Sequence, residues 1–597
     1  MSSLVLGALA LSSRACVVGP VTIATALMGR RMLNSLAPHV SSRVFNLCEK
    51  SLAVLLRSDT MHLSLSTRLE TAAGIDAVTR FDHLSELVIW PSHLIIGDSL
   101  ATSSVARALR RVSPTLRKLD LSELCQVGGS HNWHDVSRTL CNVTELTLYG
   151  NPGFDDACFR EVIVNMKSLL RLDVSATRVT AVGLRIFETA HATSRLGDLS
   201  LDELAGVGDD GIAHLRDLPF LWRLSVGDAA LTTQGIADLT SGHGLQLLRV
   251  LRLSRAGSFD PNLLPRKFAG LEFIDLASHP LAGDDFIARL AQCGGVSSLR
   301  QICMQGSPMT GQAIAALFPS SLGNLTELDL AFAQQLTSPF PVPESGAAVV
   351  AGAPLKRLML TGCSNLQDSA LAGVATASLT ASCLKHLHLG DCRHITDEGT
   401  SHLRHLRVLS DIYLSRNARL TDATLGHLSH LGDTLELLAI EDCVLMSDSG
   451  LALLRGSDGG ADGGGSFASG SGATRRPFRW LQTLRFDGCP LFSDAALALV
   501  AAQFPHMRML SMMRCPQMSD AGIAHLAASP TLRTSLCLLA AYSDSARLTT
   551  ACGPALASLV NLQHLSLPSH LNGRLNHVYH GLRWCVAPAS ALVIRNA

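Results

Sequence analysis

Residues 384–400, which read LKHLHLGDCRHITDEGT, decide the fold, because the same pattern returns along the chain with little change. The other clear copies begin at Leu355, Leu435, Leu481 and Met507. A further copy opens at Leu409 and has Asn417 where the others have cysteine. Self-similarity at a regular period indicates an array of structural repeats, and it constrains the architecture before any single element is assigned.

The spacing within one copy predicts a strand, a turn and a helix. Leu384, Leu387 and Leu389 are apolar, and the alternation of the last two is typical of a short strand with one buried face. Cys392 follows in the turn, where a thiol acts as a small hydrophobe with weak hydrogen-bonding capacity. Thr396-Asp397 then predicts a helix start, with Thr or Asp as the N-cap. One copy cannot bury its leucines alone, so we expect stacked neighbours to bury them together.

This pattern resembles the cysteine-containing class of leucine-rich repeats, in which LxxLxLxxC is followed by (T/S)Dxx(L/I). The resemblance implies an α/β leucine-rich-repeat solenoid, a horseshoe with a parallel sheet on its concave face and helices on its convex face. The best-known members are substrate receptors of SCF ubiquitin ligases, which carry an F-box ahead of the repeats, and a nucleotide-excision-repair subunit is related. The same fold serves many partners, so the pattern specifies fold more closely than function.

Weaker copies extend the array on both sides of the clear series. Their strands are expected to start near Thr60, Leu84, Leu116, Val143, Leu169, Leu196, Leu221, Leu248, Leu271, Leu299, Leu325, Arg533 and Leu562. We therefore assign residues 59–455 to the solenoid and residues 477–597 to its continuation with a C-terminal cap. Between them, residues 456–476 are rich in Gly and Ser and predict a loop insertion.

The N-terminal residues allow more than one interpretation. Residues 1–39 are a tail or a targeting segment, since residues 1–48 contain no Asp or Glu and carry four Arg, as organellar transit peptides do. Residues 40–58 predict a helical cap with one apolar face. The segment LAPHVSSRVF from Leu36 to Phe45 also resembles the opening of an F-box, with His39 where that family usually has an acidic residue.

Composition excludes some classes of function. The chain of 597 residues has 49 basic and 49 acidic residues, so no net charge recruits it to nucleic acid. Apolar runs near the N-terminus are shorter than a membrane span needs, so no transmembrane helix is expected. The 16 cysteines show no paired spacing apart from the repeat position, which favours a reducing compartment. We expect a cytoplasmic protein, with an organelle as the alternative.

The sequence predicts no catalytic residue, no cofactor and no metal site. The motifs GxSxG and HExxH are absent. The densest cluster of potential zinc ligands is separated by the repeat geometry, because His386 and His388 face the concave side, Cys392 faces the interior, and His402 and His405 lie on a convex helix. We therefore do not expect an enzyme.

The repeat register maps the concave face, because the side chains at the two ends of each strand point away from the core. The candidate partner-binding residues are Arg223, Arg252, Asp275, Glu327, Asp329, Arg357, His386, His388, Asp411, Tyr413 and Arg485. These residues are polar and mixed in sign, which suits either a solvated surface or a protein-binding trough with Tyr413 and Arg357 as anchors.

We expect the acidic residues Asp275, Glu327 and Asp329 to face a basic segment of the partner. The prediction is a monomeric, non-catalytic scaffold that binds a protein partner. The alternative, which the resemblance implies, is the substrate-recognition subunit of an SCF-type ubiquitin ligase with a cullin adaptor as a further partner.

Overall fold

The computed structural model describes residues 62–66, 85–90, 109–123, 130–190, 194–264, 268, 270–292, 298–311, 323–337, 353–454, 478–542, 547–568, 571 and 583–584. The chain divides into an N-terminal unit, Met1–Leu281, and a C-terminal unit, Ala282–Ala597. The predicted tail, the helical cap at 40–58 and the insertion at 456–476 lie outside the described residues.

The N-terminal unit is built on a parallel sheet whose strands pair in chain order. Its strands are β1 (His62–Ser66), β2 (Glu86–Trp90), β3 (Lys118–Asp120), β4 (Glu145–Thr147), β5 (Arg171–Asp173), β6 (Asp198–Ser200), β7 (Arg223–Ser225), β9 (Val250–Arg252) and β11 (Phe273–Asp275). A separate parallel pair joins β8 (Leu231–Thr232) to β10 (Gly257–Ser258).

The C-terminal unit repeats this arrangement. Its strands are β12 (Gln301–Cys303), β13 (Glu327–Asp329), β14 (Arg357–Met359), β15 (His386–His388), β16 (Asp411–Tyr413), β17 (Leu437–Ala439), β18 (Thr483–Arg485), β19 (Met509–Ser511), β20 (Leu538–Ala540), β21 (His564–Ser566) and β22 (Arg583–Trp584). Each pairs in parallel with the next.

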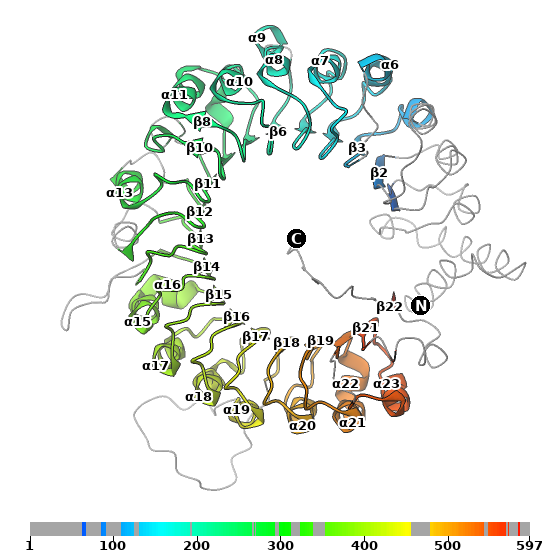
Figure 1. Ribbon diagram of the computed structural model, residues 1–597, viewed down its shortest axis with the longest axis vertical. Helices are drawn as coiled ribbons and strands as arrows, with labels where there is room; N and C mark the ends of the chain where they lie inside the picture. Colours follow the sequence, from blue (N-terminus) through cyan, green and yellow to red (C-terminus); the bar gives the residue numbers. More distant parts are fainter. Residues whose placement is uncertain are drawn as a thin grey trace, which may run out of the picture. The chain divides into compact units, whose positions relative to one another are not determined.

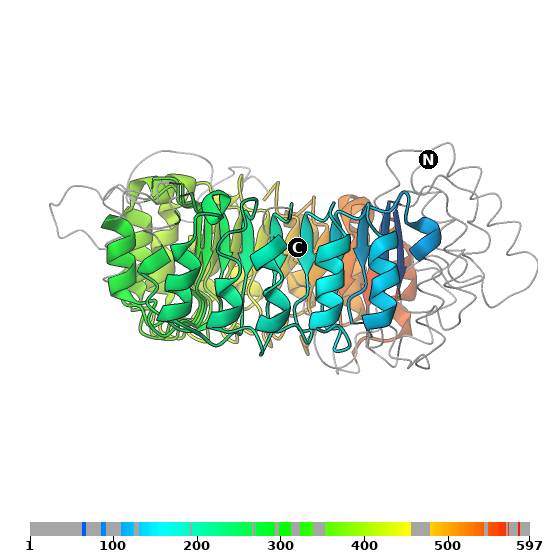
Figure 2. The same cartoon turned by 90° about the horizontal axis from the view of Figure 1, so that it is seen from above.

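Helices cover one side of each sheet (Figure 1). In the N-terminal unit they are α6 (Ser130–Thr139), α7 (Asp156–Asn165), α8 (Ala181–Leu184), α9 (Phe187–Ala190), α10 (Asp209–Ala213), α11 (Thr233–Ser241) and the 3₁₀ turn η3 (Leu245–Leu247). Figure 2 shows the cyan helices of this unit standing side by side in one layer. We call the opposite, strand-lined side of each unit its inner face.

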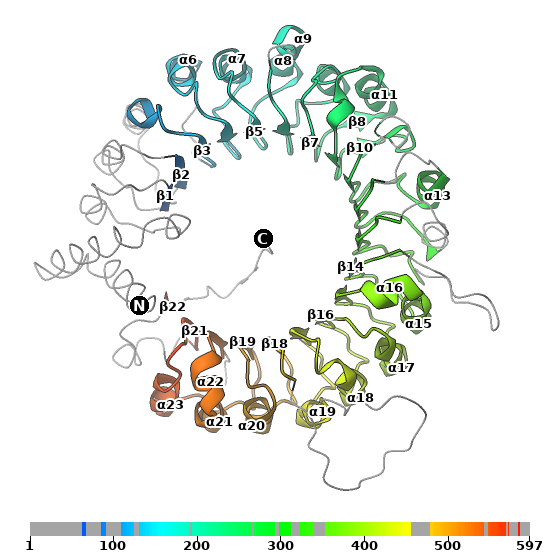
Figure 3. The ribbon, with the colours of Figure 1, turned by 180° about the vertical axis from the view of Figure 1, so that it is seen from behind.

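The C-terminal unit has the same layering, with its helices outside β14 and β16 in Figure 3. Its α-helices are α13 (Asp284–Gln292), α15 (Asp368–Thr376), α16 (Ser378–Cys383), α17 (Asp397–Ser401), α18 (Asp422–His427), α19 (Asp448–Leu453), α20 (Asp494–Gln503), α21 (Asp520–Ala528), α22 (Pro530–Ser535) and α23 (Gly553–Ala557). The 3₁₀ turns are η5 (His402–His405), η6 (Ser429–Leu431) and η7 (Thr550–Cys552). No helix in the described ranges is both long and apolar enough to cross a membrane.

The core lies between strands and helices, as the register predicts. Leu384, Leu387 and Leu389 are completely buried, and Leu387 pairs in register with Leu358 and Ile412 of the adjacent strands. Most strands have a buried central residue between two partly exposed ones, so the alternation read from the sequence is confirmed.

One predicted repeat start is wrong. The copy expected near Arg533 begins at Leu536, because Arg533 lies within α22, and the strand that follows is Leu538–Ala540. Pro530 stands in the first turn of α22, where a fixed φ and the missing N–H are tolerated. This additional helix moves the strand further along the chain.

The turn position is held by side chains that reach the preceding repeat. The thiol of Cys392 donates to the Leu360 carbonyl at 3.2 Å, and the thiol of Cys443 donates to the Leu414 carbonyl at the same distance. Asn417 donates to the Leu389 carbonyl at 2.7 Å. The amide of Asn417 thus takes the place that the thiol has in the neighbouring repeats.

Two consecutive residues at the helix start have different roles. Thr396 is the N-cap of α17, and its hydroxyl accepts from the Glu398 amide. Asp397, the first helical residue, instead accepts from the amide and hydroxyl of Thr421, the N-cap of the next repeat, at 3.0 and 2.6 Å. The Thr-Asp motif thus caps one helix and fastens it to its successor.

Candidate protein-binding face

All eleven candidate residues stand at the ends of strands, on positions that face away from the core. Arg223 opens β7, while Arg252 and Asp275 end β9 and β11 of the N-terminal unit. The other eight occupy β13 to β16 and β18 of the C-terminal unit. Asp275 therefore belongs to a different unit from Glu327 and Asp329, and each unit has its own face.

In the N-terminal unit, charges of alternating sign form a ladder at the first strand position. Lys118 lies 3.2 Å from Glu145, Glu145 lies 3.6 Å from Arg171, and Asp198 lies 3.9 Å from Arg171 and 3.4 Å from Arg223. Burial raises the pKa of Asp198, although Arg223 and Arg171 act in the opposite direction. Because neighbouring side chains of opposite charge neutralise one another, this face offers little net charge to a partner.

The candidate residues on the last two strands of this unit, Arg252 and Asp275, contact other residues of the repeats. The Arg252 guanidinium lies over the Phe273 ring, 5.2 Å from its centroid. Asp275 accepts a hydrogen bond from the Ala277 amide at 3.0 Å, which braces the turn after β11. Both side chains therefore make contacts that support the repeat itself.

In the C-terminal unit, an ion pair and a histidine–aspartate hydrogen bond join adjacent strands. Arg357 Nη1 lies 3.4 Å from Glu327 Oε1, and His386 Nδ1 lies 2.5 Å from Asp411 Oδ2. Glu327 is in register with Arg357, and His386 is in register with Asp411. Parallel in-register strands bring such side chains within contact distance.

An aromatic pair lies beside the His386–Asp411 hydrogen bond. The rings of His388 and Tyr413 stack with centroids 4.0 Å apart and planes 18° apart. Burial, with smaller contributions from the charges of His386 and Arg357 and against that of Asp411, lowers the pKa of His388 to about 4, so His388 is neutral at pH 7. Burial also raises the pKa of Tyr413. The stack is a partly exposed aromatic surface with polar neighbours.

The Asp329 carboxylate makes hydrogen bonds within the repeats. Its carboxylate accepts from the Ala331 amide at 3.0 Å and from Gln305 Nε2 at 2.5 Å, and burial raises its pKa. Asp173 and Asp275, at the same repeat position, also accept from the amide two residues on. An aspartate at the last position of a strand therefore stabilises the turn that follows. The sequence analysis did not assign this role, although the aspartate recurs at the same position of several repeats.

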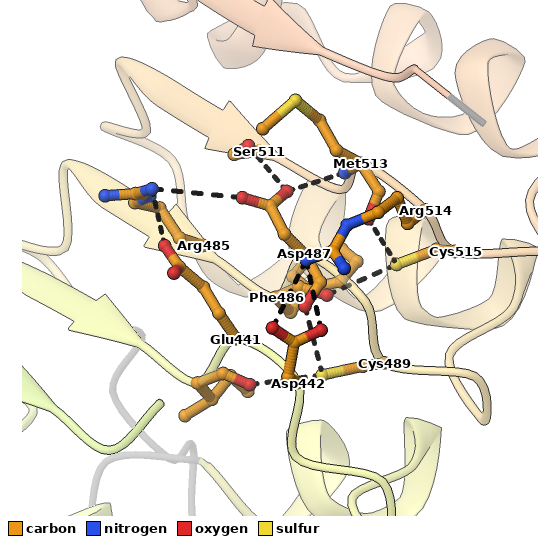
Figure 4. A network of polar contacts seen from close by, with 11 residues as sticks. Glu441, Asp442, Arg485, Phe486, Asp487, Cys489, Ser511, Met513, Arg514 and Cys515 are labelled. Carbon is orange, nitrogen blue, oxygen red and sulfur yellow. Dashed lines mark hydrogen bonds and ion pairs between the residues drawn. The ribbon is translucent and has the colours of Figure 1, made fainter. Parts of the chain in front are cut away.

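Arg485 belongs to a larger network (Figure 4). Its Nη2 lies 2.5 Å from Glu441 and 4.0 Å from Asp487, whose side chain is only 3 % exposed. Asp487 accepts from the Ser511 hydroxyl and the Met513 amide, both at 2.6 Å. Burial raises the pKa of Asp487 and of Glu441.

Neither carboxylate of this network was among the candidates. Asp202 occupies the same repeat position as Asp487 and accepts from Ser225 and Gly227, so aligning the copies would have found it. Within the described residues, no group of three or more His, Cys, Asp or Glu side chains is arranged to hold a metal ion.

Comparison with known proteins supports the fold. Residues 380–403 match the model of the Leucine Rich repeat family, and no curated protein matches the chain. Together with the repeated strand-turn-helix units, this match supports a leucine-rich-repeat solenoid fold.

Solved structures similar to the chain are more distant. The yeast Rad7 and Elc1 complex shows 13% identity and a TM-score of 0.33, covering 86% of this chain and 91% of that one. The TLR13-ssRNA13 complex shows 15% identity and a TM-score of 0.48, covering 88% and 69%. The internalin InlF from Listeria monocytogenes shows 16% identity and a TM-score of 0.36, covering 62% and 94%. All three TM-scores are below 0.5.

Proposed function

We propose that the protein is a non-catalytic interaction scaffold whose protein partner binds the inner face of the C-terminal unit. The contact region is the β13–β16 face, which we define by Glu327, Arg357, His386, His388, Asp411 and Tyr413. Partner binding would then be localised to four adjacent strands.

The stacked His388–Tyr413 pair is the observation that carries the proposal. Tyrosine and arginine are enriched among the residues that dominate binding energy at protein interfaces, and rigid side chains lose little entropy when a partner binds. The ring centroids of the pair lie 4.0 Å apart, and the His386–Asp411 hydrogen bond lies on the same two strands.

Site-specific photocrosslinking tests the proposal directly. A photoreactive phenylalanine in place of Tyr413 should form a covalent adduct with the partner in cells, because the replacement keeps an aromatic ring on the face. The same group in place of Glu398, on the helical side in α17, is the matched control and should give none. An adduct formed only from position 398 would refute the proposal.

A second candidate function is substrate recognition within an SCF-type ubiquitin ligase. The cysteine position favours it, since the Cys363, Cys392, Cys443, Cys489 and Cys515 thiols each donate to a carbonyl of the preceding repeat, which matches the class that the sequence resembles. This function needs an adaptor-binding segment, for which residues 40–58 are the candidate. Reproducible co-purification of a cullin adaptor with the full chain, lost when residues 40–58 are deleted, would support it.

A further inference from the structure

An unusual aromatic residue lies in the turn that follows β13. The repeats place a residue with positive φ in the turn after the strand, and eleven described non-glycine residues adopt this left-handed conformation. Ten of them are small or polar: Glu123, Ala176, Glu203, Asp228, Arg255, Ser278, Asp391, Arg416, Asp442 and Arg514. The eleventh is Phe332, with φ of 61°. A bulky side chain is strained in this region, so its presence calls for a reason other than the turn.

Polar side chains fix the turn that carries Phe332. The side-chain nitrogen Nε2 of Gln334 donates to the backbone carbonyls of Phe332 at 3.3 Å and Gly362 at 2.9 Å. Ser364 donates to the Gln334 side-chain oxygen at 2.5 Å, and Asn365 donates to the Gln334 backbone carbonyl at 2.6 Å. The strained residue is thus held in place by the turn of the following repeat.

Phe332 as a whole is nevertheless 52 % exposed. Gly306 and Gly362 occupy the corresponding turn positions in the repeats on either side, with φ of 66° and 75°. A Cβ at position 362 would overlap the ring, which therefore lies over the glycine backbone. Two adjacent positions without side chains leave an aromatic surface open to a partner.

Carboxylates lie close to this ring along the chain. Asp329 is three residues before Phe332, so their Cα atoms are at most about 11 Å apart. Glu327 and Asp411 are further acidic groups on the β13–β16 face, where they contact Arg357 and His386. The three carboxylates of this face outnumber its one arginine, so the face complements a basic segment.

We propose that Phe332 is the apolar anchor of the partner site, and that the partner is a protein segment carrying an apolar side chain next to a lysine or arginine. The apolar side chain lies on the Phe332 ring, and the basic side chain lies against Glu327. This inference rests on the proposed function and extends the β13–β16 face to the turn after β13.

The test uses short peptides selected from a random displayed library on the full chain. Enriched sequences should place an aromatic or aliphatic residue within a few positions of Lys or Arg. The affinity of a synthetic enriched peptide, measured by fluorescence anisotropy, should fall by about tenfold or more in Phe332→Gly and in Glu327→Lys. The thermal midpoint of Phe332→Gly should not fall, because glycine adopts this φ without strain.

Ala176→Gly is the matched control, since Ala176 has a φ of 53° and lies in the N-terminal unit. It relieves the same kind of strain and should leave the peptide affinity within about twofold. Acidic enriched peptides, or no enrichment at all, would overturn the inference. Unchanged affinity in Phe332→Gly together with weakened binding in Tyr413→Ala would overturn the role of Phe332 alone. Unchanged affinity in both variants would overturn the proposed face as well.

Discussion

Asn417 stands where five other repeats have cysteine, and its replacement gives a quantitative test of the turn. Asn417 is completely buried. Its amide nitrogen donates to the carbonyls of Leu389 at 2.7 Å and Leu414 at 2.9 Å, and its oxygen accepts from the Cys392 amide at 2.8 Å. One side chain thus connects two consecutive repeats.

Replacing Asn417 with alanine would leave two buried groups without this partner, the Cys392 N–H and the Leu389 carbonyl. The Leu414 carbonyl retains the thiol of Cys443 at 3.2 Å. At about 1–3 kcal/mol for each unsatisfied buried group, the expected loss of unfolding free energy is roughly 2–6 kcal/mol. That is a large part of the stability of an ordinary domain, about 5–15 kcal/mol.

Asn417→Cys should cost less, because a thiol at this position donates to the preceding repeat as that of Cys392 does to Leu360. Urea unfolding followed by far-ultraviolet circular dichroism gives the order of midpoints. We expect wild type to be highest, Asn417→Cys intermediate and Asn417→Ala lowest. If alanine proved as stable as cysteine, the turn would not depend on these hydrogen bonds.

Three other predictions follow from the same geometry. Leu387→Ala should lower the unfolding free energy by roughly 2–5 kcal/mol, because Leu387 is fully buried, and an unchanged urea midpoint would mean that the register is wrong. Gly488→Ala should lower the thermal midpoint, since Gly488 has a φ of 70° and a Cβ there would overlap the Asp442 carboxylate; an unchanged midpoint would show that the turn adapts. Burial lowers the pKa of His279 and of His388 to about 4. As the pH is lowered, the unfolded chain therefore binds protons at these histidines before the folded chain does, and the free energy of unfolding should decrease between about pH 6.5 and pH 4. His388→Gln should flatten this slope in urea unfolding at several pH values, and an identical slope would contradict the assignment.

The strand register could be predicted because it depends on spacing within one repeat. Apolar residues at fixed intervals must face the core, and this condition located the strands even in the weak copies from Leu116 to Leu325. It failed near Arg533, where Pro530 starts an additional helix and shifts the next strand. A local insertion of this kind changes the spacing on which the inference depends.

The contacts between repeats were harder to predict, because each joins residues that are far apart in the sequence. Asp487 bonds Ser511 and Met513 of the next repeat, and nothing in its own copy marks it as buried. The conformation of Phe332 was likewise invisible, since phenylalanine is not a residue expected at positive φ. These positions become recognisable only when all copies are aligned on the turn.

Hydrogen–deuterium exchange of the full chain with its crosslinked partner tests the central claim most directly. Binding at the β13–β16 face should slow amide exchange in β13, β14, β15 and β16 and in the turn that contains Phe332. Exchange in α17, α18 and the strands β3 to β7 should remain as in the free protein. Protection confined to those helices or to the N-terminal unit would contradict the assignment of the partner site to this face.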